Sequence, residues 1–386
     1  MTANSPDAHR DENVTAPPSA AASSSPTPSI PTPQCPMSLR MNEMAAMLNA
    51  ELADHPLYDG FEIQRFDDPE HGTGMVAFLS RRDDRTIDCY VEPGLTLDRR
   101  MYGIGHGVRS WNEIDFDQAS LEVAEDGVAA QVRFLDVDGN AIEISIDDRD
   151  GAARGRGALL APVGAGIDTP VSLMLVWMPQ FDLVRDVPGR SPAIRIGGEE
   201  AAVGRLPGGA LHRRHLIKYA ARLRVIEFNR DMDAPATAGG PGEVKVTGPD
   251  SEFGAGVSAI SAEAAGSAAR VTFRPPFPDL LRLDAGVERS GEWRIGVDGQ
   301  VLTGGTWTAT GAPDRAEVHL NVTRRWRPRW LPWLMRAVTT LLPVFRRWPT
   351  TYAWSATMPA VGGPMRSGWV RTGTDDAARY RAATNS

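Results

Sequence analysis

The sequence predicts an all-β protein built from two antiparallel barrel- or sandwich-like domains, with an N-terminal helix and a C-terminal amphipathic segment. Three observations lead to this fold class. Apolar and polar residues alternate with a period of two in many short stretches, which is typical of strands with one buried face. Long helical patterns are missing between these stretches, which disfavours a doubly wound parallel sheet. Residues 231–268 are rich in Gly, Ala, Ser and Pro, and they separate two strand-rich regions.

The N-terminal residues divide into a tail and a predicted helix. Residues 1–36 are rich in Pro and Ser and lack the apolar residues that a core needs, so they are predicted to be a tail. Met37 follows directly, and one hypothesis is that translation starts there. Residues 38–53 are predicted to be helical, because Met41, Met44, Leu48 and Leu52 recur at near-heptad spacing.

The first β domain, predicted over residues 37–230 together with this helix, contains the clearest strand patterns. Apolar residues alternate with polar ones over 128–134 and 142–146, and Asp138-Gly139 between them is a strong hairpin signal. A further alternating stretch covers residues 87–91.

The second β domain is predicted over residues 269–372, after a linker or long loop at 231–268 and before a tail at 373–386. Val318, Leu320 and Val322 alternate with polar residues there, as expected for a half-buried strand.

Gly291-Glu292-Trp293 opens a predicted strand of the second domain, and Gly-x-Trp at a first strand is the lipocalin signature. With two barrel-sized β regions, the chain resembles the double-lipocalin proteins of the carotenoid hydratase and AttH type. The resemblance implies a lipocalin-like cup for a hydrophobic small molecule, and acid-catalysed addition of water to an alkene. Trp293 then either contacts the ligand or plugs the base of its β domain.

A basic and aromatic segment, residues 324–354, is the most unusual feature of the chain. Between Glu317 and Asp375 there are nine arginines and no carboxylate, although the whole chain has a formal charge of -8. Such segregation of charge indicates an anionic or amphipathic partner. The candidate ligand or membrane contacts are Arg324, Arg325, Arg327, Arg329, Trp330, Trp333, Arg346, Arg347 and Trp348.

Within this segment, the apolar residues of 331–345 fall on one stripe of a predicted helix. Such a helix is ~22 Å long, which is too short for a hydrocarbon core of ~30 Å. Two interpretations remain open: the stripe lies in the surface of an anionic membrane, or it packs on the protein while the arginines pair with acidic residues of the first domain. Nucleic acid is disfavoured as a partner, because the rest of the chain is acidic.

Catalytic motifs give little guidance. His106 lies near Asp115 and Asp117 in sequence, and these three residues are the candidates for a site with an imidazole and carboxylates. No pattern of metal ligands or of cofactor-binding residues occurs, so neither is expected. Trp177 and Met178 follow an apolar run, and they are candidates either for a pocket wall or for the end of a buried strand.

The function expected from the sequence is binding of a lipid or other hydrophobic small molecule. The expected location is the cytoplasm, with peripheral attachment to the inner face of the membrane, since two cysteines in unrelated contexts predict no disulfide. One alternative is a cofactor-free hydratase or isomerase that acts on a hydrophobic substrate. The other is a structural protein in which the basic segment clamps two acidic domains together.

Overall fold

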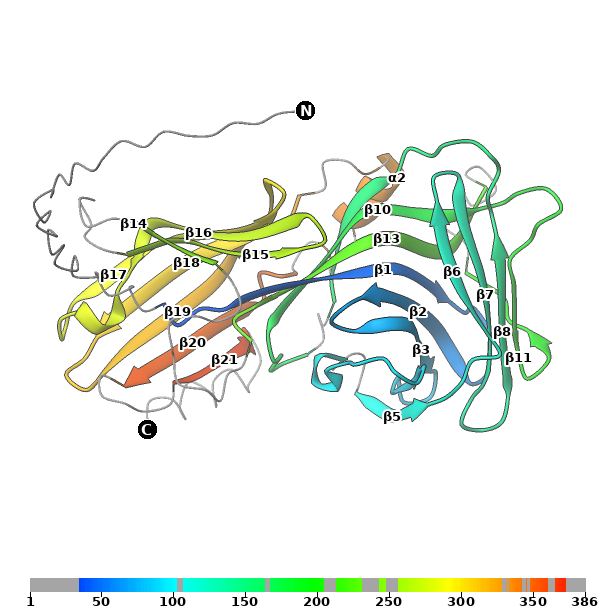
Figure 1. Ribbon diagram of the computed structural model, residues 1–386, viewed down its shortest axis with the longest axis horizontal. Coiled ribbons are helices and arrows are strands. Elements are labelled where there is room, and N and C mark those ends of the chain that lie inside the picture. The colour runs from blue at the N-terminus through cyan, green and yellow to red at the C-terminus, as the bar shows by residue number, and fades with distance from the viewer. Residues whose placement is uncertain are drawn as a thin grey trace, which may run out of the picture. The chain divides into compact units, whose positions relative to one another are not determined.

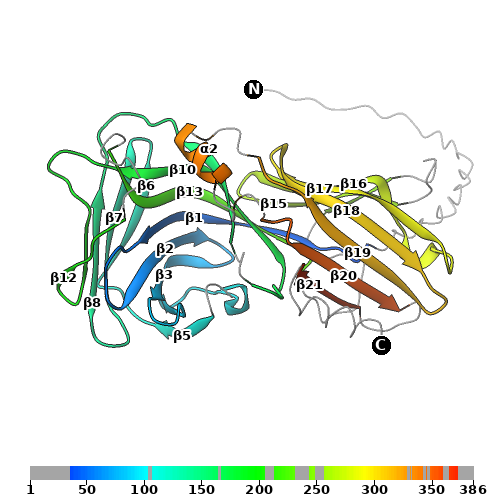
Figure 2. The ribbon, with the colours of Figure 1, turned by 180° about the vertical axis from the view of Figure 1, so that it is seen from behind.

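The structure, a computed structural model, consists almost entirely of strands in three sheets (Figures 1 and 2). It describes residues 35–102, 107–163, 167–204, 213–230, 243–247, 256–327, 331, 333–341, 345, 348–359 and 365–372. These residues all belong to one compact unit, Pro33–Ser386. The prediction of an all-β protein is confirmed.

The first sheet has the strand order β5-β4-β3-β2-β1-β13-β10-β9, and its edge pair β4–β5 is the parallel one. Its strands are β1 (Leu39–Glu51), β2 (Tyr58–Asp68), β3 (Gly72–Arg81), β4 (Ile87–Val91), β5 (Val108–Glu113), β9 (Gly157–Ala161), β10 (Leu173–Arg185) and β13 (Arg214–Phe228). The long strands β1, β13 and β10 lie side by side (Figure 1).

The second sheet has the order β12-β11-β8-β7-β6. Its strands are β6 (Gln118–Ala124), β7 (Gly127–Leu135), β8 (Ala141–Asp147), β11 (Ala193–Ile196) and β12 (Glu199–Glu200). The predicted hairpin is confirmed, since β7 pairs with β8 around Gly139, whose φ is +82°. The Asp136 carboxylate fixes this turn by accepting hydrogen bonds from the backbone N–H groups of Asp138 and Asn140. One apolar core joins this sheet to one face of β1–β4.

The third sheet has the order β14-β15-β16-β17-β18-β19-β20-β21. Its strands are β14 (Glu243–Thr247), β15 (Gly256–Ala264), β16 (Ser267–Pro278), β17 (Glu288–Val297), β18 (Gln300–Gly311), β19 (Arg315–Arg324), β20 (Tyr352–Pro359) and β21 (Arg366–Arg371). The alternation at Val318, Leu320 and Val322 is confirmed as the buried face of β19. Strands β14 and β15 lie inside the range 231–268 that the sequence predicts as a linker or long loop, so this part of it belongs to the sheet.

A shared core of the third sheet includes the ends of three strands of the first sheet. Leu39 of β1, Phe228 of β13 and Leu175 of β10 are completely buried in it. Phe228 packs against Trp293 with 5.2 Å between ring centroids. On one face, strands β1, β10 and β13 therefore contribute residues to two apolar cores, which follow one another along the strands. The opposite face of these strands lines a cavity.

In the three long strands β1, β13 and β10, the side chains that face the cavity change from one alternate set to the other at one row of residues that crosses the strands. Ala45 and Arg222 are left out of the otherwise regular register of β1 and β13, and Arg222 has a φ of +52°. Pro179 stands opposite Arg222 in β10 and has no backbone N–H to donate. On β1 the cavity side changes from Asn42 and Met44 to the odd-numbered residues that follow. Irregularities of this kind bend a sheet and redirect side chains.

The helix predicted over residues 38–53 is wrong, because these residues form strand β1. Met41 packs into the core shared with the third sheet, Met44 lines the cavity and Leu48 lies in the core of the second sheet. The strand is thus apolar on both faces, and the phase change at Ala45 produces a spacing that resembles a helical one.

The C-terminal segment contains the helix α2 (Trp333–Leu341), which is shorter than the predicted apolar stripe. Leu331 is buried and Phe345 packs against the same cluster, so both ends of the stripe contact the protein. Leu341 is 74% exposed, together with Arg336 and Thr340. Among the described residues, no helix has the length and apolar character needed to cross a membrane.

Candidate functional site

A cavity of about 950 Å³ lies against the face of the first sheet that is opposite to its two cores. Strands β1, β2, β3, β10 and β13 form its wall, and residues 96–102 and 161–163 complete it. The apolar lining residues are Met44, Met47, Ala50, Leu52, Phe61, Phe66, Phe78, Ile87, Leu97, Met101, Tyr102, Ala161, Val163, Met174, Val176, Met178, Leu223 and Val225. A concave apolar surface of this volume has the dimensions of a small-molecule site.

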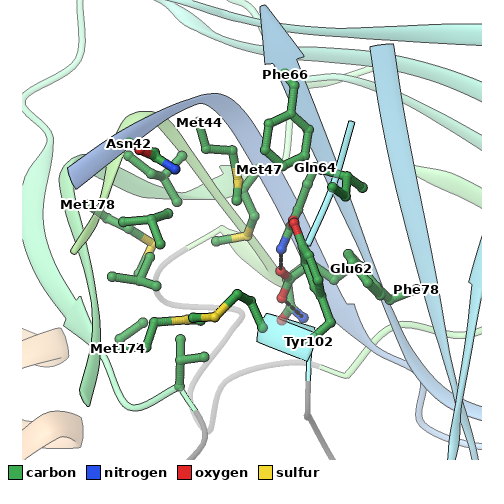
Figure 3. Close-up of a pocket in the computed structure, with 18 of the residues that line it drawn as sticks. Asn42, Met44, Met47, Glu62, Gln64, Phe66, Phe78, Tyr102, Met174 and Met178 are labelled. Carbon is green, nitrogen blue, oxygen red and sulfur yellow. Dashed lines mark hydrogen bonds between the residues drawn. The ribbon is translucent and has the colours of Figure 1, made fainter. Parts of the chain in front are cut away.

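Methionines dominate one side of the cavity. Met44 and Met47 come from β1, Met174 and Met178 from β10, and Figure 3 shows their side chains gathered opposite Tyr102. The thioether side chain is unbranched and polarizable, so it adapts to ligands of irregular shape. Aliphatic residues of β13 continue this wall. The wall therefore favours a flexible or elongated apolar molecule.

Aromatic residues close the opposite side. Tyr102 belongs to the short 3-10 turn η1 (Arg99–Tyr102), and it stacks on Phe78 with 5.4 Å between centroids. Trp111 of β5 meets both rings edge-on. This cluster places η1 against the sheet, and burial raises the pKa of the Tyr102 hydroxyl, which keeps this group neutral.

Several carboxyl groups line the cavity, and one of them is held by neighbouring amide side chains. Glu62 of β2 accepts a hydrogen bond of 2.5 Å from Gln64 Nε2 and a longer one of 3.4 Å from Asn49 Nδ2 (Figure 3). Lys218 Nζ lies 3.4 Å from the Asn49 Oδ1 atom and 3.0 Å from Glu51 at the rim. Burial raises the pKa of Glu62, although the hydrogen bond from Gln64 and the charge of Lys218 act in the opposite direction.

Glu62 is half-buried by solvent exposure, since its side chain opens onto the cavity. Gln64 is buried, and its Oε1 atom has no hydrogen-bond partner among the described residues. Gln64 therefore orients the carboxyl group of Glu62 through its Nε2 atom, while its own Oε1 atom stays without a hydrogen bond among the described residues. A neutral carboxyl in this position donates a hydrogen bond or a proton, whereas an ionised one is a base.

A second polar group of side chains lies at the other end of the cavity. It includes Glu227 and Arg230 at the end of β13, with 3.8 Å between their charged groups, and Asp98, which pairs with Arg230. Burial raises the pKa of Glu227, which Arg40 opposes. These charges largely balance one another, so this end resembles a polar rim more than a reaction centre.

The candidate residues from the sequence are distributed over several places. Met178 lines the cavity, and Trp293 is fully buried in the shared core, where it lines none of the described cavities. Asp115 and Asp117 are exposed, and neither is among the cavity residues. His106 lies outside the described residues, so the expected constellation of these three residues gains no support.

The basic and aromatic segment borders a second cavity of about 750 Å³. Arg324, Arg325, Arg327 and Trp326 line it together with Trp177 of β10. Trp348 is buried in the shared core. The side chain of Trp333 is not described, and Arg329, Trp330, Arg346 and Arg347 lie outside the described residues.

Sequence reasoning missed Glu62 as a site residue. Phe61 and Ile63 alternate with Glu62 and Gln64, and this pattern is typical of a strand whose polar face meets water. Only the tertiary structure shows that this polar face borders an apolar cavity. Met44 and Met47, which line the cavity, lie within residues 38–53, which the sequence predicts to be a helix.

Comparison with protein-family models, with curated proteins and with solved structures finds no match for this chain.

Proposed function

We propose that the protein binds an elongated, mostly apolar small molecule, such as a lipid or a polyene, in the methionine-lined cavity. The observation that carries this proposal is the combination of about 950 Å³ of space with a cluster of methionine, aliphatic and aromatic side chains that share the lining with polar and charged groups. An apolar face of a sheet normally packs against another layer of the fold, because exposed apolar surface costs free energy. A ligand in the cavity takes the place of that layer. Gly291-Glu292-Trp293, which carries the lipocalin resemblance, lies in β17 of the third sheet and lines none of the described cavities, so the proposal rests on the geometry of the cavity in the first sheet.

The proposal is tested by titrating the delipidated protein with a fluorescent polyene fatty acid and with the matching fatty alcohol. We expect saturable binding of at least one probe with one site per chain, and displacement of the probe by an unlabelled ligand of similar length. Binding that does not saturate, or that persists after thermal unfolding, would contradict a defined cavity site.

A second candidate function is catalysis by Glu62 on the bound molecule, because an oriented carboxyl with a raised pKa inside an apolar cavity is typical of general acids. In this reaction Glu62 gives its proton to one carbon of an alkene, and water adds its oxygen to the other. The second proton of that water then returns to Glu62, so that the carboxyl is regenerated. Glu62 thereby takes the role for which the sequence offered His106, Asp115 and Asp117.

Mass spectrometry of the molecules retained by the wild-type protein and by Glu62→Gln separates the two functions. A catalyst is expected to retain different molecules in the two proteins, with masses that differ by one water. A binding protein retains the same molecule in both. Asp117→Asn, which changes an exposed carboxylate, is the matched control and is expected to behave as the wild type.

A further inference from the structure

The second cavity concentrates positive charge without any carboxylate in its lining. Four arginines line it, and the other lining residues are Ala158, Trp177, Gly299, Gln300, Val301, Leu302, Thr323 and Trp326. Arg294 pairs with Glu292 at 3.2 Å. The guanidinium groups of Arg324, Arg325 and Arg327 form no ion pair with any carboxylate in the described part of the chain.

One interpretation of the sequence was that the arginines of the basic segment pair with acidic residues of the first domain. For Arg324, Arg325 and Arg327 no such pair is present among the described residues. Several guanidinium groups around one cavity repel each other, and a bound anion removes this repulsion. Each guanidinium presents five N–H donors, so the site offers far more donors than one carboxylate group accepts.

The apolar side of the same cavity is formed by two indole rings. Trp177 is buried, Trp326 is half-buried, and the rings meet edge to face with centroids 6.4 Å apart. Val301, which is 49% exposed, extends this apolar surface. A site lined by both guanidinium groups and indole rings matches an anion that carries an apolar portion.

We propose that this second cavity binds a phosphate-bearing amphiphile, with its phosphate oxygens on Arg324, Arg325 and Arg327 and its apolar portion against Trp177 and Trp326. A phosphate group offers three terminal oxygens in a compact tetrahedron, which several arginines can share. The phosphate belongs either to a lipid headgroup in a membrane or to a soluble phosphate ester. This inference does not depend on the function of the first cavity.

The test compares three probes: vesicles of phosphatidylcholine with added phosphatidic acid, a soluble short-chain phosphatidic acid, and inorganic phosphate. Arg325→Gln with Arg327→Gln removes two exposed charges from the cavity. Arg270→Gln with Arg289→Gln removes two exposed charges from the third sheet and is the matched control. We expect affinity for the phosphatidic acid probes to fall about tenfold or more in the cavity variant, and less than about twofold in the control.

Binding of both the soluble ester and the vesicles, with loss of both in the cavity variant, assigns the site to a soluble phosphate ester. Binding of the vesicles alone, with the same loss, assigns it to a membrane lipid. Equal losses in the two variants would show that only the overall charge matters, which overturns the proposal. Failure of the wild-type protein to bind any phosphatidic acid probe overturns it as well.

Discussion

Met174→Trp combined with Val225→Trp is expected to weaken binding of apolar ligands ~10- to 100-fold while the protein stays folded. Both residues line the cavity and are half-buried, so the larger side chains have space to extend into it. A ligand that loses ~100 Å² of apolar contact loses ~2.5 kcal/mol, which is a fall of ~10- to 100-fold in affinity. Titration with the fluorescent polyene probe measures this change.

The matched control is Leu135→Trp, which adds an indole ring at an exposed position of β7 outside the cavity. It is expected to bind the probe as the wild type does. Circular dichroism and thermal unfolding of the filled variant establish that its fold is intact. If the filled and folded variant binds the probe with unchanged affinity, the ligand does not occupy this cavity.

The second large effect concerns the stability of the fold as the pH changes. The pKa of Glu62 is raised above its ordinary value of 4.5, so the folded state holds this proton more tightly than the unfolded state. The free energy of unfolding therefore falls as the pH rises from about the ordinary value towards the raised one. The slope for one such group is at most ~1.4 kcal/mol per pH unit.

Glu62→Gln removes this contribution, because the amide is neutral at every pH and keeps an oxygen that accepts from Gln64 Nε2. The variant is expected to be more stable than the wild type at neutral and alkaline pH, and the difference should shrink as the pH falls from the raised pKa of Glu62 towards 4.5. Burial raises the pKa of the Tyr102 hydroxyl, so this group keeps its proton in this range. Glu227 has a raised pKa as well and remains in both proteins.

Denaturant titrations of the two proteins across this pH range measure the difference. If their stabilities keep a constant difference from acidic to alkaline pH, the pKa of Glu62 is not raised in the folded state. In that case the second candidate function, in which it supplies a proton, also fails.

The sequence predicted much of the fold because most strands here have one buried face. The hairpin at Asp138-Gly139 and the strand around Leu320 follow from alternation and turn chemistry alone. Strand β1 could not be predicted in this way, because it is apolar on both faces and because its side-chain alternation shifts by one residue at Ala45. This phase change depends on Pro179 and Arg222 in neighbouring strands, which no local pattern reveals.

The candidate sites were harder to predict, because each depends on residues that are distant in the sequence. Met178 and Trp177 are neighbours in β10, yet they line different cavities, since successive side chains of a strand point to opposite faces. Glu62 looks like a solvated strand residue until the segment around Tyr102 is seen to lie over it. The basic and aromatic segment was visible in the sequence, but Arg294 and Trp177 join it only in the folded chain.

Native mass spectrometry of the protein purified under mild conditions from its own host is the most direct test of the methionine-lined cavity as a binding site. We expect one non-covalent adduct per chain on the wild-type protein, with the mass of an apolar small molecule. The same adduct should be missing from the variant with Met174→Trp and Val225→Trp. A wild-type protein that is empty in repeated preparations and that binds no apolar probe would contradict the proposed function.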